Sequence, residues 1–445
     1  MIKGGKRKLS NWESIYKSKL TTAAEAVKHI KSGDRVMLGH GAGQPEVLVE
    51  AMAANYKQYK DVEIFHWVTY GKGQYTKPEM EGHFRFNGGF ISAPVREAVY
   101  DNRADFTPGS FHETPDQFRN GLLALDVAMV QLSPPDKHGF CSFGVSVDAT
   151  KPGAEAAKII IAEINDQMPR TYGDSFIHVS KLDYIVETSY PLVESQSRPI
   201  TEIEKRIGEN CARLIDDGST LQLGIGSVPD AVLMALEDKK DLGIHSEMIS
   251  DEVVKMYDKG VITGARKTID RGLIVVGFLA GTKLLYDFID CNPAISMRTA
   301  DYVNDPLVIM RNYKMVSINS CLQVDFTGQV CSETIDSKQY SGIGGQLDFV
   351  RGATMGKDGK SIIAIPSTAG KGKYSRIVPF LDYGSAVTTS RNDVQYIVTE
   401  YGAAQLKGKT MIQRARALIK IAHPNFISQL EEDFEKRFGR VKAVM

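Results

Sequence analysis

Long apolar runs, net charge and paired cysteines are all missing from this sequence. None of its 445 residues belongs to an apolar stretch long enough to span a bilayer, and the basic segment 1–12 leads into no apolar run typical of a signal peptide. Lys plus Arg and Asp plus Glu are balanced at 54 each, which removes the electrostatic argument for nucleic acid or an anionic membrane as a partner. We therefore expect a soluble, cytoplasmic protein with a frayed N-terminal tail.

Motifs of several common enzyme classes are also absent. The five cysteines are scattered without a CxxC pair, which predicts reduced, buried thiols and neither disulfides nor a zinc site. The nine histidines show no HExxH or similar metal-ligand spacing, so we expect no metal. The sequence has no GxSxG motif, which argues against a Ser-His-Asp hydrolase. Pro229 stands where a GxGxxG motif would need its last glycine, which argues against a nicotinamide cofactor.

Strand-like and helix-like segments alternate along the chain, which predicts an α/β protein with mostly parallel sheets. Near-continuous apolar runs are typical of strands covered on both faces, and they occur at residues 35–38, 62–65, 126–131, 158–162, 273–276, 314–318, 361–365 and 394–398. A chain of 445 residues is too long for one ordinary core. The pattern lapses into Ser, Pro and polar residues at 187–200, so we predict domains at 1–195 and 196–445.

The beginning of the second half repeats that of the first. A turn glycine precedes a loop glycine by six residues in both, at Gly33 and Gly39 and at Gly218 and Gly224. A second loop glycine follows two residues later in each copy. This spacing favours two related α/β domains, although strand, glycine loop and helix form a frequent unit and coincidence stays open.

Three segments of the second half could carry chemistry. Residues 224–228 lie between a strand and a helix, where backbone amides and the helix dipole can bind an anion. Three glycines at 342–345 would let backbone N–H groups approach a developing oxyanion. Glu247 follows a short strand through residues 242–244, and a buried carboxylate there could attack an acyl group. Tight turns at both loops, and a capping or ion-pairing role for Glu247, are the alternatives.

Other residues are weaker candidates. His245 is expected to be a packed or hydrogen-bonded neighbour of Glu247 and not a base. The amide of Asn319, at the end of a strand, could donate to an oxyanion. Residues 356–360 predict a hairpin turn, whereas residues 370–373 fit an exposed turn and a phosphate contact about equally.

Several sequence blocks together resemble the acetyl-CoA hydrolase/transferase family of CoA-transferases, which includes 4-hydroxybutyrate and butyryl-CoA:acetate CoA-transferases. The blocks are Ser133-Pro-Pro-Asp-Lys-His-Gly-Phe-Cys141, Gly218-Ser-Thr-Leu-Gln-Leu-Gly-Ile-Gly226, Gly243-Ile-His-Ser-Glu-Met-Ile-Ser-Asp251, Gly342-Ile-Gly-Gly-Gln-Leu-Asp-Phe-Val-Arg351, Thr388-Thr-Ser-Arg-Asn-Asp393 and Val398-Thr-Glu-Tyr-Gly402. The resemblance implies two similar open α/β domains of the CoA-transferase fold with the active site between them. It also implies a homodimer or larger homo-oligomer.

The resemblance further implies that Glu247 is the nucleophile, which becomes an acyl anhydride and then a glutamyl-CoA thioester. Asn319 and Gly344 are the implied catalytic partners, and Glu400 lines the implied substrate pocket. Residues implied to contact coenzyme A are Gly224, Ile225, Gly226, Ser227, Val228, Gly342, Gly345, Gln346 and Lys373. From the first half, we expect the loop of residues 39–44, including Gln44, to shape the substrate pocket.

The predicted function is therefore the transfer of CoA, by a ping-pong mechanism, between a short-chain acyl-CoA and acetate. The acyl group is expected to be 4-hydroxybutyryl or butyryl, and neither metal nor nicotinamide is needed. An acyl-CoA hydrolase on the same scaffold is the first alternative. A sugar-phosphate isomerase and a non-catalytic CoA-binding protein are the others.

Overall fold

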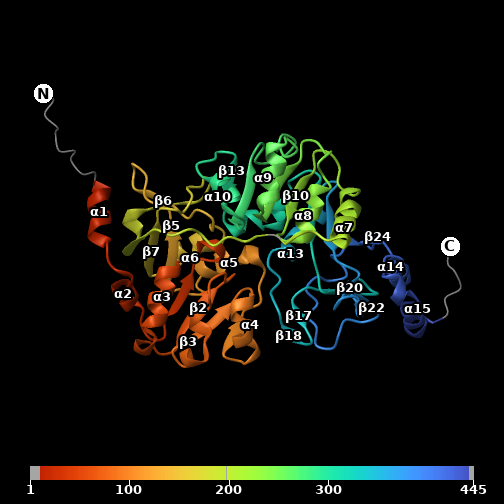
Figure 1. The fold of residues 1–445 in the computed structure, drawn as a ribbon, viewed down its shortest axis with the longest axis horizontal. Helices are drawn as coiled ribbons and strands as arrows, with labels where there is room; N and C mark the ends of the chain where they lie inside the picture. Colours follow the sequence, from red (N-terminus) through yellow and green to blue (C-terminus); the bar gives the residue numbers. More distant parts are fainter. Residues whose placement is uncertain (1–10, 197, 440–445) are drawn as a thin grey trace.

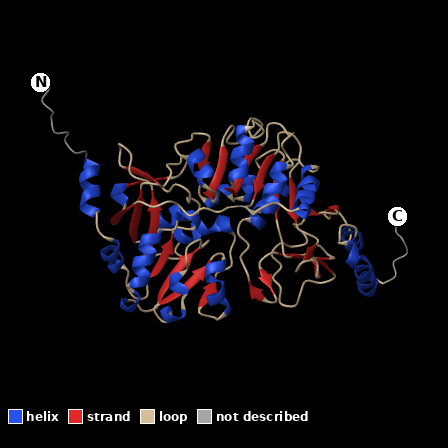
Figure 2. Ribbon diagram, in the orientation of Figure 1, coloured by secondary structure: helices blue, strands red, loops and turns tan. Residues whose placement is uncertain are grey.

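The computed structural model describes residues 11–196 and 198–439 and contains one large sheet in each half of the chain (Figures 1 and 2). The first sheet has the order β4-β3-β2-β1-β5-β7-β9 and the second has the order β13-β12-β11-β10-β14-β19-β23-β24. All neighbouring strands in both sheets are parallel except β23 and β24. The predicted α/β class with mostly parallel sheets is confirmed.

The strands of the first sheet are β1 (Arg35–Leu38), β2 (Val62–His66), β3 (Phe84–Gly88), β4 (Ala104–Phe106), β5 (Val127–Leu132), β7 (Ile159–Asn165) and β9 (Tyr184–Thr188). Those of the second are β10 (Thr220–Leu223), β11 (Gly243–Ile249), β12 (Ile274–Leu279), β13 (Ile295–Met297), β14 (Met315–Asn319), β19 (Lys360–Ala364), β23 (Tyr396–Thr399) and β24 (Gly402–Gln405).

Each half begins at a central strand of its sheet, β1 or β10, runs outward to one edge, and then returns to build the other side. The two halves therefore share one strand order, to which the second half adds β24. This shared topology supports two related domains over a chance repetition of glycines.

Most predicted elements are present, with shifts at their ends. Helix α3 (Glu46–Ala54) follows the first glycine loop, and α7 (Glu202–Ala212) is capped by Thr201, whose hydroxyl accepts from Glu204 N–H. Helix α9 (Asp251–Asp258) directly follows β11, and α14 (Met411–Ile419) and α15 (Pro424–Phe438) complete the described chain. Helix α8 (Ser227–Met234) begins at Ser227, inside the loop expected at residues 224–228.

The hairpin predicted at residues 356–360 is wrong. Helix α13 (Gln346–Met355) ends there and the chain turns directly into β19, with Asp358 at φ 54°. A hairpin is found instead at residues 370–373, which join the short strands β20 (Thr368–Ala369) and β21 (Tyr374–Ser375).

One apolar cluster extends across both halves. A single cluster of buried side chains contains Val130 and Val145 from the first half and Ile249 and Leu279 from the second. The backbone also joins them, because Val147 N–H donates to Gly277 O at 3.1 Å and Leu279 N–H donates to Val145 O at 2.9 Å. Helices α1 (Asn11–Lys19) and α15 lie at opposite ends of the long axis (Figure 1).

The segment between β9 and α7 contains the proposed domain boundary at residues 195 and 196. The predicted frayed tail lies outside the described residues, except for Asn11 and Trp12, which begin α1. Four cysteines are free and buried, but Cys291 is exposed, so the expectation of buried thiols is wrong there. Within residues 11–196 and 198–439, no helix is long and apolar enough to cross a membrane.

Candidate active site between the two halves

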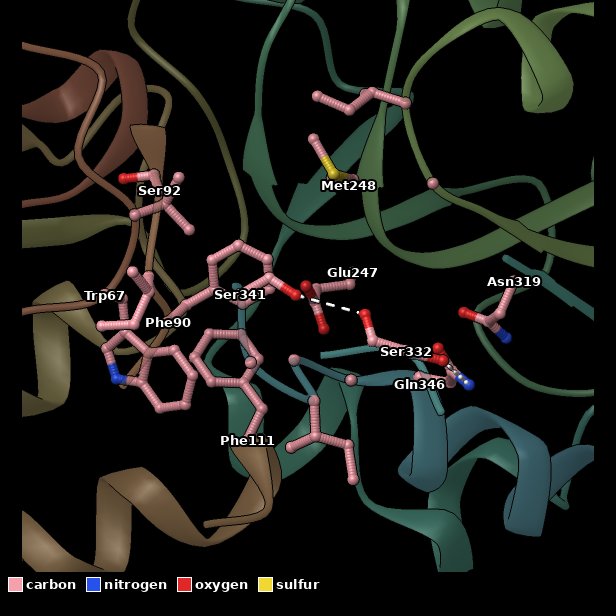
Figure 3. A pocket seen from close by; sticks show the side chains of 18 of the residues that line it. Trp67, Phe90, Ser92, Phe111, Glu247, Met248, Asn319, Ser332, Ser341 and Gln346 are labelled. Carbon is pink, nitrogen blue, oxygen red and sulfur yellow. Dashed lines mark hydrogen bonds between the residues drawn. The ribbon is translucent and has the colours of Figure 1, made fainter. Parts of the chain in front are cut away.

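A cavity of about 490 Å³ lies between the two halves of the molecule (Figure 3). The second half contributes the carboxyl ends of its central strands, namely Leu223 of β10, Glu247 of β11 and Asn319 of β14. Ligands of open parallel sheets bind at this edge, where the strand order reverses. Residues that line the cavity from the first half are His40, Trp67, Val68, Tyr70, Phe90, Ile91, Ser92, Ala93, Arg96 and Phe111.

An irregularity of β11 places Glu247 at the cavity. Leu221 of β10 pairs with Ile244 and Leu223 pairs with Met248, so a step of two residues on β10 spans four on β11. The Ser246 hydroxyl fills the gap: it accepts from Leu223 N–H at 3.2 Å and lies 3.0 Å from Leu223 O and 2.7 Å from Met248 O. The predicted short strand thus continues through Glu247 to Ile249. Such bulges commonly re-aim side chains at active sites.

The two oxygens of Glu247 have different surroundings. Asn304 Nδ2 donates to Oε2 at 2.7 Å, and the Gly345 backbone amide adds a hydrogen bond to the carboxylate. A Cβ on Gly345 would lie 2.0 Å from Oε2, so only glycine fits there. Gly344, at φ +54°, is the residue nearer Oε1. Oε2 is therefore held by the Asn304 amide, which leaves Oε1 as the oxygen available for attack.

Burial raises the pKa of Glu247 to about 8. The hydrogen bonds from Asn304 and Gly345 act in the opposite direction, whereas the nearby carboxylates of Asp148 and Asp348 raise the pKa further. The ionised form is therefore weakly solvated and costly to create, which is the condition under which a carboxylate becomes a reactive nucleophile.

Asn304 is positioned by His245. It follows α11 (Ala300–Val303), and His245 Nε2 donates to the carbonyl of Val303 at 2.9 Å. Burial lowers the pKa of His245 to about 4, which keeps the ring neutral. His245 is thus a hydrogen-bonded neighbour, as expected. Asn304 itself was missed, because Val303-Asn304-Asp305-Pro306 reads as an ordinary helix end.

The glycine loop before α13 touches both halves. A Cβ on Gly342 would lie 3.0 Å from Gly89 O and 3.2 Å from Phe90, so the absence of a side chain permits this close contact. Gly345 is the N-cap of α13, whose N-terminal dipole favours negative charge beside Glu247. Behind the loop, Gln346 Nε2 donates to Ser332 Oγ at 3.0 Å and to Thr389 Oγ1 at 3.1 Å.

Comparison with known proteins identifies the family. The acetyl-CoA hydrolase/transferase N-terminal domain matches residues 5–194, and the C-terminal domain of the same family matches residues 281–434. The chain belongs to the acetyl-CoA hydrolase/transferase family. The resemblance inferred from the sequence blocks is confirmed.

Three relatives cover nearly the whole chain. It is 60% identical to the 4-hydroxybutyrate coenzyme A transferase of Clostridium kluyveri over 427 residues, which is 96% of this chain and 100% of the relative. Identity to the butyryl-CoA:acetate CoA-transferase of Anaerostipes caccae is 40%, over 96% of this chain and 98% of the relative. The crystal structure of 4-hydroxybutyrate CoA-transferase from Porphyromonas gingivalis superposes with a TM-score of 0.84 at 45% identity, covering 96% and 100% of the two chains.

Many of the site residues predicted for this family member meet at the cavity. Those that line it are Gly224, Ile225, Glu247, Asn319, Gly342, Gly344, Gly345 and Gln346. Gly226, Ser227 and Val228 line an adjoining cavity of about 460 Å³ at the N-terminus of α8. The two cavities share Ile225 and Ser320, so they form neighbouring compartments of one region.

Three predicted residues are not brought to the cavity. Gln44 is buried at the end of the loop of residues 39–44, where its Nε2 donates to Glu46 Oε1 at 3.0 Å. Glu400 accepts from Ser367 N–H at 2.9 Å and from the Ser367 hydroxyl at 2.6 Å. Lys373 lies in the hairpin of β20 and β21, beside a different cavity bounded by α15. Their local spacing gave no indication of these partners.

The first half forms an aromatic wall that the sequence did not predict. Phe111 packs on Trp67 with ring centres 4.4 Å apart, and Figure 3 places both, with Phe90, on the side of Glu247 opposite Asn319. His40 also lines the wall, and its Nε2 lies 2.6 Å from Asp148 Oδ1. Such a lining would exclude water from a reactive acyl group.

Proposed function

We propose that this protein moves CoA between a short-chain acyl-CoA, 4-hydroxybutyryl-CoA or butyryl-CoA, and acetate through a covalent glutamyl-CoA intermediate on Glu247. One observation carries the proposal: a half-buried carboxylate faces the cavity between the halves, with Oε2 held by Asn304, 2.7 Å away, and with a further hydrogen bond to the carboxylate from the Gly345 amide. The names of the relatives from Clostridium kluyveri and Anaerostipes caccae support the choice of substrates.

The first half-reaction forms the intermediate in two steps. Oε1 of ionised Glu247 attacks the thioester carbonyl and the C–S bond breaks. CoA leaves as a thiolate, and the acyl group and Glu247 form a mixed anhydride. The thiolate then attacks the glutamyl carbonyl carbon, the anhydride C–O bond breaks, and the original acid leaves as its carboxylate. Acetate reverses both steps and departs as acetyl-CoA, which restores the Glu247 carboxylate.

Hydrogen-bond donors are available for both oxygens that gain charge, the glutamyl oxygen and the substrate carbonyl oxygen. The charge that develops on Oε2 during thiolate attack would meet the Asn304 amide already in place, and the Gly345 N–H donates to the same carboxylate. We assign stabilisation of the substrate carbonyl to Asn319 and the Gly344 amide. The phosphates of CoA would lie in the adjoining cavity, against the backbone amides of residues 226–228 at the N-terminus of α8. Assembly as a cytoplasmic homodimer or larger homo-oligomer is part of the proposal on the resemblance alone.

The test is to trap the intermediate. The protein is incubated with butyryl-CoA or 4-hydroxybutyryl-CoA without acetate, treated with borohydride, and mapped by peptide mass spectrometry. Reduction of a glutamyl-CoA thioester to an alcohol is expected in the peptide that contains Glu247. Glu247→Ala should lose this modification and at least about 10³-fold in transfer rate while its fold is unchanged.

Glu252→Gln is the matched control, because Glu252 lies in the first turn of α9 and pairs with Lys255. It should retain both labelling and turnover. An unmodified Glu247 peptide, or near wild-type transfer by Glu247→Ala, would refute the proposal. Release of free acid at the same rate with and without acetate would instead favour the hydrolase.

A further inference from the structure

Arg96 connects the first half to the glycine loop of the second. It belongs to α4 (Ala93–Tyr100) and lines the cavity. Its Nε donates to the carbonyl of Tyr340 at 2.9 Å, and its guanidinium carbon lies 3.8 Å from the centre of the Tyr340 ring. The Arg96 side chain therefore contacts both the backbone and the ring of Tyr340 across the interface between the two halves.

Tyr340 begins the segment of residues 340–345, whose last residue, Gly345, lies against the Glu247 carboxylate. The Tyr340 N–H donates to Glu333 O at 2.7 Å, which ties the start of this segment to the chain around Glu333. Gly342 then packs on Phe90, and Gly345 packs on Oε2 of Glu247. Any displacement of Tyr340 would be transmitted over five residues to the backbone amides beside the nucleophile.

We propose that Arg96 is a positioning residue that holds residues 340–345 closed over Glu247 and thereby favours transfer of CoA over hydrolysis. The proposal rests on the proposed function. In the competing reaction, water attacks the glutamyl carbonyl, the C–S bond breaks, CoA leaves as a thiol, and the water oxygen stays in the Glu247 carboxylate. A loosened loop would admit water and would also misplace the amide donors, so hydrolysis should rise while transfer falls.

The test compares Arg96→Met and Arg96→Lys with a matched control. Methionine keeps an apolar stem but removes both contacts, whereas lysine keeps a cation over the ring and removes the Nε hydrogen bond. The control is Lys338→Met: Lys338 of β18 (Lys338–Gln339) lies 5.1 Å from the centre of the Tyr100 ring, across the same interface but outside the cavity lining.

The rate of transfer to acetate and the rate of acyl-CoA loss without acetate are measured for each variant in ¹⁸O-labelled water. For Arg96→Met we expect the hydrolysis-to-transfer ratio to rise about tenfold, with the KM for acyl-CoA changed less than about twofold. Arg96→Lys should fall between Arg96→Met and wild type, and Lys338→Met should match wild type. Label in the Glu247 carboxylate, read from its peptide by mass spectrometry, reports the entry of water, which simple loss of stability would not produce. Part of this label passes to the acid released in later turnovers, because the anhydride C–O bond breaks on the glutamyl side.

An unchanged ratio would overturn the proposal. So would a variant whose only change is a higher KM for acetate or acyl-CoA, because Arg96 would then be a substrate-binding group. The trapping experiment on the wild type separates this outcome from the proposed function. A wild type without a modified Glu247 refutes the function, whereas a modified Glu247 with an unchanged ratio refutes only the role of Arg96.

Discussion

The two halves have the same strand order but differ where the central strand meets its neighbour. In the first half, Arg35, Val36 and Met37 of β1 pair with Glu63, Ile64 and Phe65 of β2 without interruption. In the second half, the corresponding pair of β10 and β11 slips by two residues beside Ser246. Glu247 lies at this slip. A repeated scaffold therefore acquires its candidate nucleophile through one local departure from the regular ladder.

The halves also differ in what they present to the cavity. The first half offers aromatic rings, among them Trp67, Phe90 and Phe111, and the second offers a carboxylate with polar donors. One half thus provides a wall that excludes water and the other provides the reacting groups. Substitutions on the second half should therefore change rates more than matched substitutions on the first.

Among substitutions that keep Glu247, the largest effect should come from Gly345→Ala. Its methyl group would lie 2.0 Å from Glu247 Oε2 and 2.2 Å from Asn304 Nδ2, so the nucleophile or the loop must move. We expect transfer to fall by at least about 10²-fold in steady-state assays, since small misplacements at a reacting centre have costs of this order. Gly109→Ala in the first half is the control, because its methyl group would meet nothing nearer than Gln117 Nε2 at 3.6 Å. Equal activity of the two variants would remove the distinction between the halves.

A smaller effect is expected for Asn304→Ala, and it should depend on pH. Wild-type kcat/KM should rise with pH up to about 8, because the attacking form of Glu247 is ionised and burial raises its pKa to about 8. Asn304 donates to the carboxylate and lowers this pKa, so its loss should move the rise to higher pH. At pH 7 we expect a fall of about tenfold, with partial recovery above the new midpoint. If the pH profile of kcat/KM for Asn304→Ala had the same midpoint as that of the wild type, Asn304 would not be lowering the pKa of Glu247.

The same raised pKa affects stability. The folded protein binds the Glu247 proton more tightly than the unfolded chain, whose carboxyl titrates near 4.5. Stability relative to Glu247→Gln should therefore be greatest below about 4.5 and should be lost as the pH rises to about 8. Thermal unfolding of both proteins across this range would show the difference.

The smallest effect should come from Ser246→Ala. The substitution leaves the Leu223 N–H without its hydroxyl partner, so we expect a loss of about 1–3 kcal/mol in the free energy of unfolding. Transfer should fall several-fold as Glu247 loses its support. Ser317→Ala on adjacent β14 is the control, since that buried hydroxyl has no hydrogen-bond partner among the described residues. Equal losses of stability in Ser246→Ala and Ser317→Ala would show that Ser246 does not stabilise the register shift between β10 and β11.

Much of the site in the second half could be predicted because each of its groups lies in a segment with a recognisable local pattern. Glu247, Gly224 and Asn319 stand at the ends of recognisable strands, and Gly344 belongs to a cluster of three glycines. The structure brings all four to one cavity. Asn304 could not be predicted, because its partner is 57 residues away and nothing in its own segment marks it.

The aromatic wall escaped prediction for a related reason. Trp67, Phe90 and Phe111 look like ordinary core residues in sequence, and only the packing of one half on the other turns them toward Glu247. Gln44 and Glu400 show the opposite error. Each follows a plausible motif, but a nearby polar partner, Glu46 or Ser367, holds its side chain elsewhere.

The core shared by the two halves has a consequence for how the protein comes apart. Val145 and Leu279 lie in one apolar cluster and are joined by a backbone hydrogen bond of 2.9 Å, although they belong to different halves. A protease cut in residues 189–196 should therefore leave two fragments that co-migrate on a sizing column until denaturant is added. Neither fragment expressed alone is expected to stay in solution, because each would expose its share of this apolar cluster to water.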